Sequence, residues 1–175
     1  MSKILASIKN ISEAKILIDS EIDIIDLKDP SNGALGKLEN NDIEDIINFI
    51  SKKKLTSSTI GDLPNDERLI AKNVSDLSNT EVDFIKIGVY ENNYIDTLSK
   101  IISCKKLIAV FFADKFLPTK EEIIILKNSG FSGVMIDTSN KKSGNLFNHV
   151  SDTDVHDFIL NAKNLNLLTG IAGSI

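Results

Sequence analysis

The amino-acid sequence predicts an α/β protein of the (β/α)8 TIM-barrel type, and three observations lead to this class. Short runs rich in β-branched residues alternate with amphipathic stretches, which is typical of a parallel sheet with right-handed helical connections. Seven such runs fit into 175 residues, at about 25 residues per unit, a spacing that suits a barrel. The first run leads into Lys9-Asn-Ile-Ser12, without the phosphate-binding glycine loop that an open doubly wound sheet usually carries there.

The expected strands and helices alternate from one end of the chain to the other. The β-branched runs predict seven strands, at residues 3–8, 22–28, 54–59, 82–88, 106–112, 133–137 and 167–172. The amphipathic stretches between them predict helices near residues 12–20, 41–51, 66–78, 91–103, 119–128 and 152–164. Thr119-Lys-Glu-Glu122 has the form of a capping box, so the fifth of these helices is expected to begin there.

The number of units predicts an incomplete barrel. A full eightfold barrel needs one more strand and two more helices, and typically about 250 residues. No linker, low-complexity segment or change of composition divides the chain. Residues 1–175 are therefore expected to form one domain that lacks the last strand and the last two helices. Because the first and last strands of such an arc have unpaired backbone edges, a homo-oligomer is also expected.

Composition and charge exclude several classes of protein. The chain is 42% apolar and 26% charged, and no apolar run approaches the roughly 20 residues of a membrane span. The first residues lack a signal-peptide core, so a cytoplasmic protein without membrane contacts is expected. The net charge is −5 and the one clear basic run, Lys52-Lys-Lys54, lies at a helix end, so no nucleic-acid partner is expected. Cys104 is the single cysteine, and His149 and His156 lack metal-ligand spacing, so no metal site is expected.

Two lysines end strand-like segments: Lys28 in the second predicted strand and Lys86 in the fourth. Because side chains alternate along a strand, Asp26 and Lys28 share one face and Ile25 and Leu27 share the other. Helices cover the outside of a barrel, so the apolar pair is expected to point outward and the charged pair inward. The same alternation places inside the barrel Phe84, Lys86, Gly88, Met135 and Asp137.

Inward lysines at this end of a barrel are typical of phosphate binding or of imine formation. An imine-forming lysine must be neutral, which requires lowering its pKa from about 10.4 to about 7, or roughly 5 kcal/mol. A second ammonium about 4 Å away supplies about 4 kcal/mol at an effective dielectric constant of about 20. Lys28 and Lys86 are expected to face each other in this way, one as nucleophile and the other as perturbing cation or proton shuttle. The alternative is that each lysine extends from its strand into water.

Several loop residues have two possible roles. The two glycines of Ser31-Asn-Gly-Ala-Leu-Gly36 either allow backbone amides to approach a ligand or form a plain turn. Gly61-Asp-Leu-Pro64 also has the composition of a turn. Lys141 either captures a phosphate group or is a solvated loop charge. Asp114 is either a proton-transfer group or a helix cap.

The ordered set of motifs resembles a known family. It comprises Asp26-Leu-Lys-Asp-Pro-Ser-Asn-Gly-Ala-Leu-Gly36, Thr59-Ile-Gly-Asp-Leu-Pro64, Phe84-Ile-Lys-Ile-Gly-Val-Tyr90, Asp137-Thr-x-x-Lys141, Leu146-Phe-x-His149 and Ala172-Gly-Ser-Ile175. In their order and spacing these segments are similar to (5-formylfuran-3-yl)methyl phosphate synthase, an enzyme of methanofuran biosynthesis, and the resemblance covers essentially the whole chain.

The resemblance implies a Schiff-base lyase that condenses two molecules of glyceraldehyde 3-phosphate, with loss of phosphate and water. It implies that Lys28 forms the Schiff base and Lys86 accepts a proton, with no metal or organic cofactor. The remaining residues of the expected polar site, which bind the phosphorylated aldehyde or assist the chemistry, are Asp26, Asp114, Asp137, Lys141, Gly173 and Ser174. The family continues beyond Ala172-Gly-Ser-Ile175 into an eighth strand with a phosphate loop, of which this chain has at most half.

Two other functions fit the same residues. One is a different Schiff-base aldolase, or a phosphosugar isomerase on the same barrel, and an isomerase would not need a covalent lysine. The other is a shortened, non-catalytic barrel that serves as a binding or assembly partner. Trapping of a covalent lysine adduct separates a Schiff-base aldolase from an isomerase. The mass of the protein in solution tests whether the chain is an assembly partner.

Overall fold

The computed structural model describes residues 2–140, 142 and 144–173. Its seven strands form one parallel sheet in the order of the chain: β1 (Leu5–Ile8), β2 (Ile24–Leu27), β3 (Leu55–Thr59), β4 (Phe84–Val89), β5 (Lys106–Phe112), β6 (Gly133–Asp137) and β7 (Leu168–Ile171). The α-helices are α1 (Ile11–Leu17), α2 (Asn40–Ile50), α3 (Glu67–Ser78), α4 (Tyr94–Leu98), α5 (Lys120–Asn128) and α6 (Asp152–Asn164). None of the helices in the described part of the chain has the length and apolar character needed to cross a membrane.

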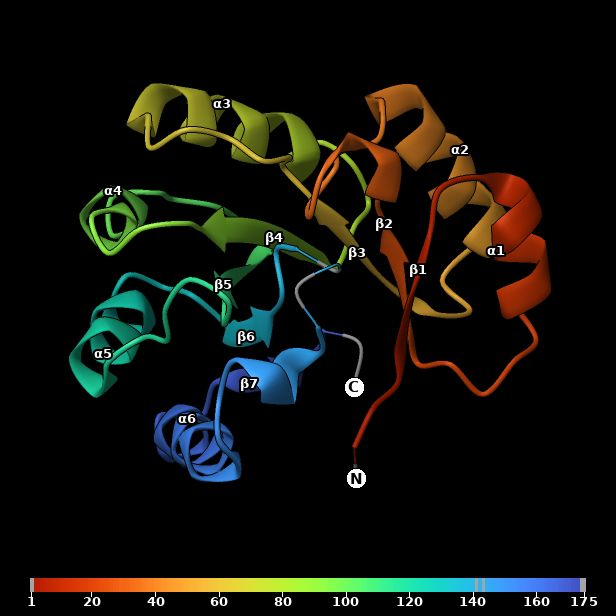
Figure 1. The fold of residues 1–175 in the computed structure, drawn as a ribbon. Coiled ribbons are helices and arrows are strands. Elements are labelled where there is room, and N and C mark those ends of the chain that lie inside the picture. The colour runs from red at the N-terminus through yellow and green to blue at the C-terminus, as the bar shows by residue number, and fades with distance from the viewer. Residues whose placement is uncertain (1, 141, 143, 174–175) are drawn as a thin grey trace.

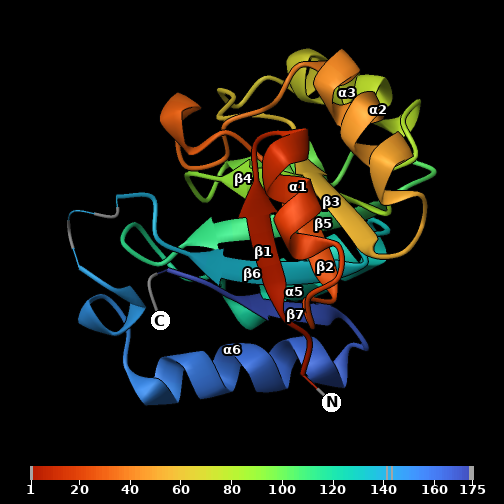
Figure 2. The same cartoon turned by 90° about the vertical axis from the view of Figure 1, so that its right-hand side faces the viewer.

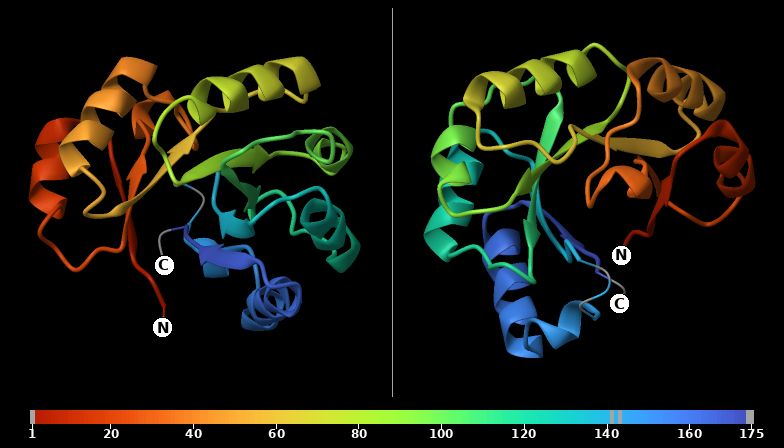
Figure 3. Two further views of the ribbon diagram at one scale, coloured as in Figure 1. Left: turned by 180° about the vertical axis from the view of Figure 1, so that it is seen from behind. Right: turned by 45° about the horizontal axis from the view of Figure 1, so that its top comes forward.

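The sheet curls into an open arc with the helices on its outer side. Figures 1 and 2 show α1 to α6 surrounding the strands, and both views of Figure 3 show the open side between β1 and β7. Within the described residues, β1 pairs only with β2 and β7 only with β6. The α/β class and the parallel sheet are confirmed, and the curled half-barrel is consistent with part of a TIM-like barrel.

The main hydrophobic core lies between the outer face of the sheet and the helices. Ile25 and Leu27 of β2 and Ile85 and Ile87 of β4 belong to this core, and each is almost fully buried. These residues alternate along their strands with Asp26 and with Lys86, which therefore face the inner side of the arc. The predicted facing of both strands is confirmed.

A second, smaller apolar cluster fills part of the inner face. Its buried members are Leu35, Val110, Phe112 and Met135. Val110 and Phe112 come from β5 and Met135 comes from β6, whereas Leu35 comes from the loop after β2. The inner face thus carries an apolar cluster on β5 and β6, whereas β1 to β4 contribute the polar side chains of Ser7, Asp26, Ser57 and Lys86.

The observed boundaries lie within three residues of the predicted ones except at α4. The capping box at Thr119 is present, with hydrogen bonds in both directions between Thr119 and Glu122. The helix predicted over 91–103 is wrong in length, because α4 spans only Tyr94–Leu98. After Leu98 the chain forms tighter turns, in which Ile101 N–H donates to the carbonyl of Leu98. These turns bury the Ile101 side chain, which ends the regular helix early. Two short 3₁₀ turns, η1 (Pro30–Asn32) and η3 (Leu146–Asn148), were not predicted.

Candidate functional site

A fully buried carboxylate is the centre of the polar half of the inner face. Asp26 has no exposed surface, and its Oδ2 lies 2.6 Å from Nζ of Lys86. Ser57 donates a hydrogen bond of 2.6 Å to Oδ1, and Ser7 donates one of 3.0 Å to Oδ2. Three different strands thus supply the partners of one carboxylate, which satisfies the requirement that a buried charge be paired and hydrogen-bonded.

The register of the parallel sheet explains why these side chains meet. Ser7 of β1 and Ser57 of β3 are both aligned with Asp26, so the three side chains lie side by side on the same face. Lys86 is aligned with Thr59, two residues further along β3. Its long side chain therefore returns by one layer to reach Asp26.

Opposing effects act on the protonation of Asp26. Burial by itself would raise the pKa of this carboxyl group. The charge of Lys86, the hydrogen bonds from Lys86 and Ser57, and the charge of Lys28 outweigh burial and lower the pKa below its ordinary value of 3.8. Asp26 is therefore a carboxylate at neutral pH, and it forms the ion pair with Lys86 in this state.

Lys28 follows directly after β2 and is 9% exposed. Leu27 is aligned with Ser58, so Lys28 continues the strand to the level of Thr59 and Lys86. The two lysines thus lie in one layer, as the alternation of side chains predicts. Nζ of Lys86 contacts the carboxylate of Asp26 directly, and Nζ of Lys28 donates a 3.3 Å hydrogen bond to the carbonyl of Ala34, while the charge of Lys28 also acts on Asp26.

The loop that follows β2, residues 29–36, carries that carbonyl and is held by residues from two other strand ends. Asp62, after β3, accepts a hydrogen bond of 2.9 Å from the backbone N–H of Leu35 and another from the hydroxyl of Tyr90. The hydroxyl of Thr59 donates to the carbonyl of Leu35 at 2.9 Å. The composition of Gly61-Asp-Leu-Pro64 predicts only a turn for Asp62, and the sequence pattern predicts no role for Tyr90. The signal that could have identified Tyr90 is its position two residues after Gly88, on the inward side of β4.

Asp114 stands in a second set of hydrogen bonds. Its carboxylate accepts from the backbone N–H and the hydroxyl of Ser139 and from the N–H of Asn140. Burial alone would raise the pKa of Asp114, but these hydrogen bonds lower it. Asp114 thereby connects the loop after β5 with the loop after β6, a role that neither of its two sequence interpretations included.

The other predicted site residues lie at the ends of β6 and β7. Asp137 is the last residue of β6, and its Oδ1 accepts a 2.7 Å hydrogen bond from the N–H of Thr138. Gly173 has a positive φ of 111°, and its carbonyl accepts from the N–H of Leu146 at 2.7 Å. Lys141 and Ser174 lie outside the described residues.

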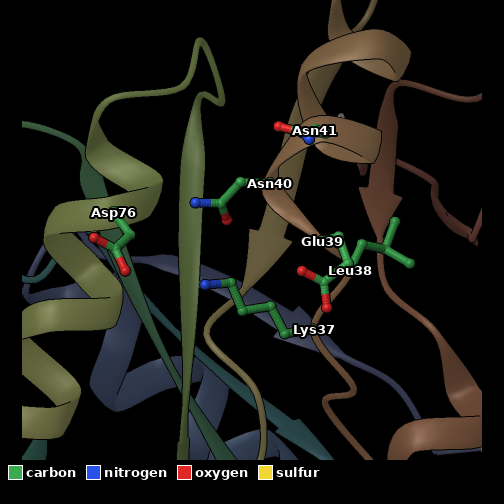
Figure 4. A pocket seen from close by; sticks show the side chains of 6 residues that line it. All are labelled: Lys37, Leu38, Glu39, Asn40, Asn41 and Asp76. Atoms are coloured by element: carbon green, nitrogen blue, oxygen red, sulfur yellow. The ribbon is translucent and has the colours of Figure 1, made fainter.

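A separate cavity of about 370 Å³ lies between α2 and α3 (Figure 4). It is lined by Lys37, Leu38, Glu39, Asn40, Asn41 and Asp76. Lys37 donates a 3.1 Å hydrogen bond to Asn73 of α3. None of the residues of the Asp26 cluster lines this cavity. Elsewhere in the described chain, no group of three or more histidine, cysteine, aspartate or glutamate side chains could hold a metal ion.

Solved structures share the fold of this chain. The CutC protein of Streptococcus agalactiae superposes with a TM-score of 0.80 at 16% identity, over 100% of this chain and 89% of that protein. Dihydrodipicolinate synthase from Agrobacterium tumefaciens superposes with a TM-score of 0.61 at 12% identity, over 98% of this chain and 70% of that enzyme. At such low identities the likeness concerns the fold alone.

Sequence relatives are more specific. The (5-formylfuran-3-yl)methyl phosphate synthase of Methanococcus aeolicus is 29% identical over 187 aligned positions, covering 98% of this chain and 80% of that protein. The protein of the same name from Archaeoglobus fulgidus is 28% identical, covering 99% of this chain and 80% of the relative. The family model for 4-HFC-P synthase matches residues 4–175. This match extends over nearly the whole chain, and the chain therefore belongs to the 4-HFC-P synthase family.

Proposed function

We propose that this chain is a (5-formylfuran-3-yl)methyl phosphate synthase that acts in methanofuran biosynthesis. It condenses two molecules of glyceraldehyde 3-phosphate through a lysine Schiff base, with loss of one phosphate and water. One observation carries the proposal: Lys28 lies in the same layer as Lys86, which forms a buried ion pair with Asp26 in the adjacent layer, on the inner face of a sheet whose sequence matches this family.

The environments of the two lysines support Lys28 as the nucleophile. Nζ of Lys86 is held in an ion pair with the carboxylate of Asp26 at 2.6 Å, so attack on an aldehyde by this amine would first require the buried pair to separate. Lys28 continues β2 at the level of Lys86, and its amine donates to the backbone carbonyl of Ala34. A neighbouring ammonium and an apolar surrounding both favour a neutral amine. Lys28 is 9% exposed, and Leu35, the direct neighbour of Ala34, belongs to the inner apolar cluster and brings apolar surface close to its amine.

The Lys86–Asp26 pair is suited to move protons once the imine has formed. A protonated imine withdraws electrons and acidifies the adjacent carbon, so a base must remove a proton there. Lys86 donates its proton to the hydroxyl that leaves as water when the carbinolamine of Lys28 dehydrates, and as a neutral amine it then accepts the proton from the adjacent carbon, while Asp26 holds it in place by a hydrogen bond. The same proton is then available for the hydroxyl or phosphate that leaves. Asp137 is proposed to assist the chemistry. The proposed binding site for the phosphorylated substrate consists of Asp114, Lys141, Gly173 and Ser174.

Reductive trapping tests this proposal directly. The chain is incubated with glyceraldehyde 3-phosphate and borohydride, and the adduct is located by peptide mass spectrometry. We expect an adduct on Lys28, no adduct in Lys28→Ala, and adduct without furan product in Lys86→Ala. Lys37→Ala is the matched control. This lysine donates to Asn73 at the cavity between α2 and α3, which no residue of the Asp26 cluster lines, so the Lys28 adduct should be unchanged in this variant. An unchanged adduct in Lys28→Ala would refute the assignment, and a folded chain that forms furan without any adduct would exclude the Schiff base.

The expected homo-oligomer is also a proposal. In the described sheet, β1 and β7 each pair on one side only, and unpaired strand edges favour association. Light scattering coupled to size-exclusion chromatography is expected to give a multiple of 19.2 kDa. A monomer at micromolar concentration would contradict this expectation.

A further inference from the structure

The loop over residues 29–36 is fastened by one carboxylate that belongs to another strand end. Oδ1 of Asp62 accepts hydrogen bonds from the N–H of Leu35, at 2.9 Å, and from the hydroxyl of Tyr90. Oδ2 lies against Gly33, at a place only 1.9 Å from where a Cβ atom at that position would be. Both carboxylate oxygens of Asp62 therefore contact this loop, and the loop has a glycine, Gly33, where the carboxylate comes closest.

Tyr90 is itself held firmly in place. Its ring stacks on Phe112 with the ring centroids 4.8 Å apart. It also lies against Gly88, where a Cβ atom would come within 2.7 Å of the ring. Burial, followed by the hydrogen bond to Asp62, raises the pKa of the Tyr90 hydroxyl well above its ordinary value of 10.0. The hydroxyl therefore remains a hydrogen-bond donor throughout the physiological pH range.

Leu35, which is held by Asp62, directly follows Ala34, the residue that contacts Lys28. Leu35 is bound on both sides of its backbone, because its N–H donates to Asp62 and its carbonyl accepts from Thr59. Its side chain is 1% exposed and belongs to the inner apolar cluster. Ala34 is joined to Leu35 by a planar peptide bond, and its carbonyl accepts from Nζ of Lys28.

We propose that Asp62 and Tyr90 are positioning residues: they fix Leu35, and through it the Ala34 carbonyl that orients the amine of Lys28. This inference rests on the proposed function, because it takes Lys28 as the imine-forming residue. Neither residue needs to contact the substrate. Misplacement of a reacting group by as little as 1 Å can slow a reaction by about a hundredfold, so a fixed carbonyl next to the nucleophile has a large effect.

The test measures Lys28 trapping by borohydride over a range of glyceraldehyde 3-phosphate concentrations in Asp62→Ala, Asp62→Asn and Tyr90→Phe. A positioning role predicts that the limiting trapping rate falls about tenfold in Asp62→Ala, with the half-saturating concentration unchanged within about twofold. Asp62→Asn should show a smaller loss, because an amide oxygen can still accept from Leu35. Tyr90→Phe is the mildest change and should retain the fold.

Tyr94→Phe is the matched control. The Tyr94 hydroxyl also donates to the loop after β3, but to the carbonyl of Leu63 at 2.8 Å rather than to Asp62. Tyr94→Phe removes the same hydroxyl group from the neighbour of Tyr90, and it should leave the limiting trapping rate within about twofold of the unsubstituted chain. An equal loss in Tyr94→Phe would show that any loosening of that loop suffices, and would overturn the proposal. A change in half-saturating concentration alone would also overturn it, since Asp62 or Tyr90 would then bind substrate.

Hydrogen exchange of the Leu35 amide provides a readout that does not depend on the reaction. In the ligand-free chain this amide should exchange at least about tenfold faster in Asp62→Ala and Tyr90→Phe, and at the normal rate in Tyr94→Phe. If the unsubstituted chain forms no Lys28 adduct, the proposed function fails, and the attachment of the loop is judged by exchange alone. Unchanged exchange in both variants would overturn the positioning role even if Lys28 is trapped.

Discussion

The buried ion pair between Asp26 and Lys86 allows one prediction to be worked out in detail. Nζ of Lys86 and Oδ2 of Asp26 lie 2.6 Å apart, and the side chains are 4% and 0% exposed. At an effective dielectric constant of about 20, this separation corresponds to an attraction of about 6 kcal/mol. Desolvation of the two charges costs several kcal/mol, so the net stabilisation by the pair is much smaller than the attraction.

Removal of both partners is expected to cost less than the two single removals added together. Lys86→Met leaves the Asp26 carboxylate buried with its hydrogen bonds from Ser7 and Ser57, so the free energy of unfolding should fall by about 3 kcal/mol. Asp26→Asn leaves the ammonium of Lys86 buried without a carboxylate, and the loss should be about 4 kcal/mol. The double variant buries no charge at this place, and its loss should be at least about 2 kcal/mol smaller than the sum of the two single losses.

Urea unfolding at pH 7, followed by circular dichroism, measures these differences. The exposed pair between Lys100 and Glu67, 3.2 Å apart with side chains 59% and 51% exposed, is the control. Lys100→Met should change the free energy of unfolding by less than about 1 kcal/mol, because solvent screens this pair. Additive losses in the Asp26 and Lys86 variants would refute the reasoning, since they would show that the two charges do not interact in the folded chain.

Three further predictions follow from single residues. The lowered pKa of Asp26 stabilises the chain above pH 3.8. The difference in unfolding free energy between the unsubstituted chain and Asp26→Asn should therefore be constant near neutral pH and shrink as the pH falls below 3.8. A difference that grows on acidification would contradict this prediction. Gly33 has φ 111° and ψ −173°, a region essentially limited to glycine, and a Cβ atom there would also clash with Asp62. Chemical denaturation should therefore show a larger loss of unfolding free energy for Gly33→Ala than for Gly130→Ala, whose added Cβ meets no atom within 4 Å. Equal losses would show that the clash is relieved. Asp114→Ala removes the acceptor of the Ser139 amide, which should exchange at least about tenfold faster by hydrogen-exchange mass spectrometry, with normal exchange as the contrary result.

The elements of the fold could be predicted because their signals are local. The predicted strands 106–112 and 133–137 coincide with β5 and β6, and the helix predicted at 152–164 coincides with α6. These segments have clear periodicity and, in α6, a capping serine. The error at α4 has a physical cause, because the tight turns that end it are stabilised by burial of Ile101, which the local sequence does not reveal.

The sequence by itself determined which side chains of β2 and β4 face inward, because the alternation of side chains is a property of the strand. Asp26, Lys28 and Lys86 could be assigned to one face before any partner was known. Only the tertiary structure decided that Lys86 pairs with Asp26, 60 residues away. The attachment of the loop after β2 through Asp62 and Tyr90 was likewise beyond local patterns. Such contacts depend on the register between strands and on the paths of loops, which are set by packing across the whole sheet.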